Sequence, residues 1–207
     1  MKHKATAESA LRKELGRIAL REAERLAFPP TEWEANTLAE LLALPRVTVT
    51  RPPEEHLLAA GMVPKDCHVN CSTQVANDPD RLSRHVWGWW IYSPIVVLHS
   101  VVEVRGQWLC LTPTMTPLPS RFQFIPDASI EWLKANDGVA THGFRGGVKL
   151  PDALRRYPEH HLRMRDELRA LMASGMTAFD AWQIVDAKLG AERTLVQDQI
   201  RDLLIRK

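Results

Sequence analysis

The feature that most restricts the fold of this chain is a run of three β-type segments between residues 85 and 111. Residues 85–92, 95–104 and 107–111 are rich in branched and aromatic side chains, which is typical of strands. The dipeptides Ser93-Pro94 and Arg105-Gly106 lie between the segments and favour tight turns. Strands joined this closely predict an antiparallel meander, and residues 121–125 are expected to add a fourth strand.

Helical patterns flank this meander on both sides. Residues 6–28 and 32–44 space their apolar side chains at helical intervals, and prolines follow both segments. Asp66 is placed to cap a helix that begins at Cys67 and ends near Ala76. Residues 128–134 and most of the chain after Lys149 also have helical patterns, including a last helix over 191–207.

The sequence therefore predicts an α+β fold in which an antiparallel sheet of about four strands packs on a cysteine-bearing helix. N-terminal and C-terminal helices surround this core. We expect a helical arm over residues 1–45, an α+β core over 46–127 and a helical region over 128–207.

Composition excludes several classes of protein. Apolar residues make up 45% of the 207 positions and charged residues 25%, values that suit a globular protein with a core. A net charge of +2 argues against a polybasic nucleic-acid binder, and no uninterrupted apolar stretch is long enough to span a membrane. The charged N-terminus does not resemble a secretory signal, and three cysteines do not form a disulfide framework. Together these features predict a cytoplasmic protein with free thiols.

Cys67 and His99 are the candidate catalytic residues. A cysteine at a helix N-terminus is close to unsatisfied N–H groups that favour the thiolate form. A histidine on a neighbouring strand could pair with that thiolate and later protonate a leaving group. A third group would orient the imidazole, and the strand after His99 offers Cys110 or Thr112, besides the amide of Gln107.

The same stretch resembles the transglutaminase-like and papain-like cysteine folds. It is also similar to uncharacterised small bacterial proteins with the pattern Cys-His-x-Asn, Gly-Trp, His-Ser-Val and Asp-Ile-Thr-Pro. The matching residues are Cys67, His68, Asn70, Gly88, Trp89, His99, Ser100, Val101, Leu111, Thr112 and Pro113. The match covers about 50 residues, and Cys110 stands where that pattern has its aspartate.

The resemblance implies a cysteine-dependent hydrolase or acyltransferase that acts on an amide or isopeptide bond of a protein or peptide. Cys67 would be its nucleophile and His99 its base and acid, and no cofactor would be needed. Orienting or substrate-binding roles fall to Asn70, which lies one helical turn after Cys67, to Thr112 or Cys110, and to Trp89.

Other hypotheses use the same residues. The first is a catalytically inactive module on the same fold, which would bind a protein partner through its Trp-rich sheet and helical arms. The second is a zinc-stabilised interaction domain with ligands from Cys67, Cys71, His99 and Cys110. The third assigns these cysteines and the histidine to the core, where such residues are often buried.

Overall fold

The computed structural model describes residues 2–114, 118–134 and 141–189. The helices are α1 (Lys2–Leu26), α2 (Glu32–Ala43), α3 (Glu54–Ala59), α4 (Cys67–Ala76), α5 (Pro158–Ala173) and a further helix over 178–189. The strands are β1 (Val47–Thr50), β2 (Ser83–Tyr92), β3 (Ile95–Val104), β4 (Gln107–Leu109), β5 (Arg121–Pro126), β6 (Ile130–Lys134), β7 (Thr141–Arg145), β8 (Val148–Lys149) and β9 (Ala153–Arg155). The expected helix over 191–207 lies outside the described residues.

The protein has an α+β fold, as predicted, but the main sheet is a closed barrel of mixed direction. The antiparallel meander of β2, β3 and β4 forms as expected. The expectation of a simple antiparallel sheet of four strands is wrong, because β5 pairs back to β2 and β1 joins β5 to β4. The β1–β4 pairing is parallel, with Thr50 opposite Leu109, and it closes the ring. β9 extends the sheet beyond β3.

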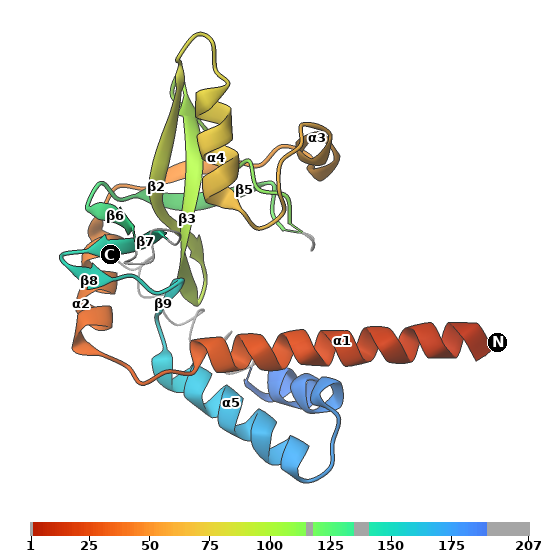
Figure 1. Cartoon of the computed structure of the whole chain (residues 1–207). Coiled ribbons are helices and arrows are strands. Elements are labelled where there is room, and N and C mark those ends of the chain that lie inside the picture. Colours follow the sequence, from red (N-terminus) through yellow and green to blue (C-terminus); the bar gives the residue numbers. More distant parts are fainter. Residues whose placement is uncertain (1, 115–117, 135–140, 190–207) are drawn as a thin grey trace, which may run out of the picture. The chain divides into compact units, whose positions relative to one another are not determined.

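Strand alternation separates the residues inside the barrel from those outside it. The interior is filled by the apolar residues Val49, Val101, Cys110, Phe122 and Phe124. On the outer surface, α4 packs over β2 and β3, where Cys71 contacts a cluster containing Val102 and Leu111 (Figure 1). A second outer cluster joins Leu38 and Leu41 of α2 to Trp89, Val96, Ile125, Ile130, Leu150 and Leu154.

A buried ion pair attaches α2 to β9. Glu34 and Arg155 have side-chain exposures of 3% and 0%. Both carboxylate oxygens of Glu34 accept hydrogen bonds from Arg155, at 3.0 Å from Nε and 2.6 Å from Nη2. The backbone N–H of Arg155 adds a third bond to the same carboxylate, at 2.9 Å.

The prediction of a helix over 128–134 is wrong. Residues 130–134 form β6, which pairs with β7, and β8 completes a three-stranded sheet. Pairing with β7, a tertiary interaction, determines the conformation of this short segment and outweighs the helix propensity of its residues. The helical expectation for the residues just after Lys149 is also wrong, since β9 occupies Ala153–Arg155 and α5 begins at Pro158.

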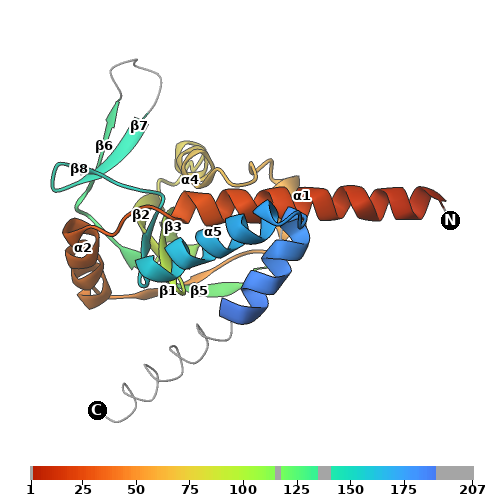
Figure 2. The same cartoon turned by 90° about the horizontal axis from the view of Figure 1, so that it is seen from below.

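Contacts divide the chain into two compact units, residues 32–156 and residues 1–31 together with 157–207. The first contains the barrel and the small sheet. In the second, α1 lies beside α5 (Figure 2), and Leu168, Ala181, Val185 and Leu189 form the buried core. Thr177 caps the helix over 178–189, because its Oγ1 accepts a hydrogen bond from the N–H of Asp180. Among the described residues, none of the helices has the length and hydropathy required to cross a lipid bilayer.

Candidate functional site

The helix that carries Cys67 forms where the sequence predicts it. α4 begins at Cys67, and Asp66 caps it by accepting a hydrogen bond from the N–H of Val69 at 3.2 Å. The thiol is partly buried beneath this helix start. Burial raises the pKa of Cys67, and hydrogen bonding to Ser100 only partly opposes the rise. The position at the helix N-terminus therefore does not yield a stable thiolate.

His99 lies inside the barrel, where it is only 7% exposed. Its Nε2 lies 3.3 Å from Sγ of Cys110, and its ring lies near those of Trp90 and Phe122. Burial lowers the pKa of His99 to about 3, and the positive charge of Arg51 lowers it further. The low pKa keeps His99 a neutral imidazole, which lies beside the Trp90 and Phe122 rings and near the charge of Arg51.

The structure places Cys67 and His99 against opposite faces of β3. Ser100 points outward to α4, where its Oγ lies 3.1 Å from Nδ1 of His68 and where it contacts Cys67. His99, the preceding residue, points inward because successive side chains alternate across a strand. Within the described residues, the cysteine that contacts His99 is Cys110, which is fully buried.

Asn70 orients a loop. Its Oδ1 accepts a hydrogen bond from the N–H of Val63 at 2.7 Å, and its Nδ2 donates to the carbonyl of Val63 at 2.8 Å. This pair of bonds fixes the segment that leads into α4. The side chain is 2% exposed, so a loop-orienting role accounts for its position.

Trp89 and Thr112 also lie in the interior. Trp89 is fully buried, and its indole N–H donates to Oδ2 of Asp127 at 3.0 Å. Thr112 is 6% exposed, and its Oγ1 has no hydrogen-bond partner within the described ranges.

The alternative zinc site is not assembled. In the part of the chain that the structure describes, no group of three or more His, Cys, Asp or Glu side chains could hold a metal ion. The proposed ligands are divided, because His99 and Cys110 face the barrel interior while Cys67 and Cys71 belong to the outer helix.

An outer aromatic cluster lies where α4, β2 and β6 meet, and sequence reasoning missed it as a unit. It consists of His68, His85, Trp87 and Trp132, all half-buried. The His68 ring lies 4.5 Å from both Trp87 and Trp132, and His85 lies 3.8 Å from Trp87. Strand alternation along β2 indicates that His85 and Trp87 share one face of the strand. The contribution of Trp132 could not be found in this way, because the sequence predicted a helix over 128–134.

The electrostatics of this cluster favour neutral rings. Burial lowers the pKa of His68, and burial together with the neighbouring His68 lowers the pKa of His85 to about 4. Nδ1 of His85 lies 3.4 Å from Oγ of Ser72. In contrast, Nε2 of His85 and Nε1 of Trp132 are buried without a hydrogen-bond partner among the described residues.

Comparisons with known proteins do not assign the chain to a group. No model of a protein family matches it. No curated protein and no solved structure matches it either. The resemblance to transglutaminase-like folds therefore stays a prediction.

Proposed function

We propose that this protein is a catalytically inactive binding module that recognises a protein segment through the outer aromatic cluster. The observation that carries the proposal is the partly exposed cluster of His68, Trp87 and Trp132, whose ring centroids lie 4.5–4.6 Å apart in tilted and edge-on arrangements. Aromatic side chains of this kind are enriched in protein interfaces, since they combine a large apolar surface with a polar edge.

The unpaired ring nitrogens of the cluster indicate what the partner would supply. Buried N–H groups are nearly always hydrogen-bonded in native proteins, and leaving one unpaired costs about 1–3 kcal/mol. Nε1 of Trp132 is such a donor, and Nε2 of His85 lies in the same cluster. Both nitrogens are buried, so a peptide reaches them only by moving a ring of the cluster; an apolar side chain that inserts there would bring a carbonyl or carboxylate oxygen to Nε1 of Trp132.

The geometry around Cys67 gives less support to catalysis. A thiol nucleophile requires a lowered pKa or an adjacent base. Burial raises the pKa of Cys67, and the imidazole of His99 lies inside the barrel beside Cys110. The cysteine hydrolase predicted from the resemblance would need these two side chains to meet.

A displayed peptide library, selected on the wild-type protein, tests the binding proposal. The selected peptides should bind the Cys67→Ala variant as tightly as the wild type, and the Trp132→Ala variant at least tenfold more weakly. His68→Gln should also weaken binding, and this substitution removes less apolar volume than Trp132→Ala does. Tyr92→Ala is the matched control, because Tyr92 is an aromatic residue on β2 that is 45% exposed and lies outside the cluster.

Two results would contradict the proposal. Peptides that bind wild type and the folded Trp132→Ala and His68→Gln variants equally well would show that the cluster is not the binding surface. Turnover of a fluorogenic amide that disappears in Cys67→Ala would instead support the cysteine hydrolase.

A further inference from the structure

Arg51 is a buried arginine at one end of the barrel interior. The residue follows β1 and is 8% exposed. Its guanidinium carbon lies 5.3 Å from the ring centre of Trp90 and 5.2 Å from that of Phe122, and both rings pack with the side chains that fill the barrel. A guanidinium stays charged at any pH at which a protein is folded. The barrel therefore encloses a positive charge, and none of the described carboxylates forms an ion pair with it.

Other enclosed arginines of this chain do have carboxylate partners. Arg155, whose side chain is 0% exposed, pairs with Glu34. Arg145, whose side chain is 16% exposed, pairs with the buried carboxylate of Asp127. This is the usual arrangement, because a buried charge is costly unless an opposite charge and hydrogen bonds compensate it. Arg51 departs from it.

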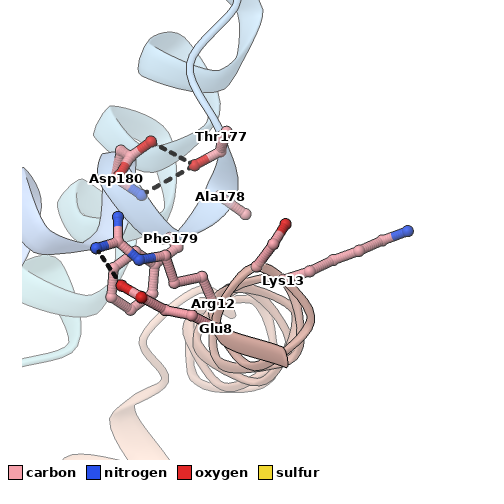
Figure 3. Close-up of a pocket in the computed structure, with 8 residues that line it drawn as sticks. Glu8, Arg12, Lys13, Thr177, Ala178, Phe179 and Asp180 are labelled. Carbon is pink, nitrogen blue, oxygen red and sulfur yellow. Dashed lines mark hydrogen bonds and ion pairs between the residues drawn. The ribbon is translucent and has the colours of Figure 1, made fainter. Parts of the chain in front are cut away.

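Stacking on aromatic rings does not replace a carboxylate partner elsewhere in the chain. Arg12 stacks on the Phe179 ring at 5.5 Å and also pairs with Glu8 at 3.2 Å (Figure 3). Rings attract the face of a guanidinium, but its N–H groups point outward along the edges of the plane and still require acceptors. The two rings beside Arg51 thus offset part of the cost of its burial and leave its edges open.

One edge of the Arg51 guanidinium has no acceptor. Nη1 donates to the carbonyl of Pro119 at 3.1 Å. Nε is buried and has no hydrogen-bond partner among the described residues, and Nη2 has no partner there either. Nη2 is not enclosed, so solvent reaches the guanidinium at this nitrogen. Nε and Nη2 form one edge of the planar group, and such an edge donates two parallel hydrogen bonds to a carboxylate or a phosphate.

We propose that Arg51 binds a small oxyanion, a carboxylate or a phosphate, at this end of the barrel. One oxygen accepts a hydrogen bond from Nη2, and a second oxygen reaches Nε when the side chains that cover this nitrogen move. The anion supplies the negative charge that the enclosed guanidinium lacks. Trp90 lies on the opposite face of β2 from Trp87 of the outer aromatic cluster, so the inference is independent of the proposed binding function.

A purely structural role accounts for less of this geometry. The bond from Nη1 to Pro119 holds the segment that leads into β5, but it uses one of the five N–H donors of the guanidinium. A buried charge is a costly donor for a single neutral carbonyl. A structural role also predicts that no anion binds at Arg51, and this difference can be measured.

Nuclear magnetic resonance of the arginine side chains in the full-length protein tests the proposal. Sodium phosphate and sodium acetate are titrated separately, and sodium chloride keeps the ionic strength constant. We expect the Nε–H signal of Arg51, identified by its loss in Arg51→Met or Arg51→Lys, to shift and to saturate with at least one of the two anions. Saturation with phosphate alone identifies a phosphate ligand, and saturation with acetate alone identifies a carboxylate.

Matched variants test the assignment to Arg51 by isothermal titration calorimetry. Arg51→Met removes the charge and keeps an unbranched side chain on the rings, and it should bind the anion at least tenfold more weakly than wild type. Arg51→Lys keeps the charge but lacks the edge with two donors, so it should also lose at least tenfold. Arg121→Met is the control, because Arg121 is an exposed arginine that lies opposite Thr50, the residue before Arg51. Its affinity should stay within twofold of wild type.

Three results would overturn the proposal. The first is a wild-type Arg51 signal that does not saturate with either anion, and this result does not depend on the folding of any variant. The second is equal affinity of wild type and Arg51→Met. The third is an equal shift of the Nε–H signals of all arginines, which would show general screening of charge instead of a site.

Discussion

The buried Glu34–Arg155 pair provides the most demanding test of the fold. Replacing Glu34 by Gln removes a carboxylate that accepts three hydrogen bonds from Arg155, while the Arg155 side chain stays fully buried. Loss of one partner from a buried ion pair typically costs about 3–5 kcal/mol, because the remaining charge is no longer compensated. We therefore expect Glu34→Gln to lower the free energy of unfolding by roughly that amount.

Urea unfolding followed by tryptophan fluorescence is a suitable assay, since six of the seven tryptophans lie in the unit of residues 32–156. With a denaturant slope of about 2 kcal/mol per molar, the midpoint should fall by about 2 M. Replacing both partners by Met should recover much of the loss, because an apolar pair leaves no buried charge.

The control is Arg84→Gln in the same unit. Arg84 is 66% exposed and pairs with Glu103 at 3.3 Å, and exposed pairs contribute at most about 1 kcal/mol. If Glu34→Gln changes the free energy of unfolding by no more than Arg84→Gln does, the reasoning from burial is refuted.

Two further substitutions test the barrel. Gly88→Ala should destabilise the protein by about 3 kcal/mol or more, because the new Cβ would lie 2.1 Å from the carbonyl oxygen of Ile125. Thermal unfolding measures this loss, and the control is Gly106→Asn, which changes a glycine at an uncrowded turn. Equal melting temperatures of the two variants would contradict the prediction. The free energy of unfolding should also fall as the pH drops from about 6.5 toward 4, because the lowered pKa of His99, about 3, lets the unfolded chain bind a proton that the folded chain does not. His99→Gln should reduce this slope by up to about 1.4 kcal/mol per pH unit, and an unchanged slope would place His99 outside the barrel interior.

The parts of the fold that depend on local sequence could be predicted. The meander follows from strand patterns separated by Ser93-Pro94 and Arg105-Gly106, and the start of α4 follows from the cap at Asp66. Closure of the barrel could not be predicted in this way. It depends on β1 pairing with β4, and the paired residues Thr50 and Leu109 are far apart in the sequence.

The candidate site shows the same division. Strand alternation accounts for the placement of Trp87 and Trp89 on one face of β2 and of Trp90 on the other. The local sequence does not specify which face of β3 is covered by α4. A pairing of Cys67 with His99 was therefore predicted, but α4 covers the opposite face and contacts Ser100. The outer aromatic cluster was missed because Trp132 reaches it only when residues 130–134 pair as a strand with β7.

The alkylation rate of Cys67 as a function of pH tests most directly the proposal that Cys67 is not a catalytic nucleophile. Iodoacetamide modification of each cysteine can be followed by mass spectrometry of peptides. We expect Cys67 to react slowly at neutral pH, with a rate that rises only above the ordinary thiol pKa of about 8.5, because burial raises its pKa. Cys71, whose pKa burial raises to about 12, should react more slowly still. A Cys67 rate that reaches its plateau below about pH 7.5 would contradict this account and would restore the cysteine hydrolase as the leading function.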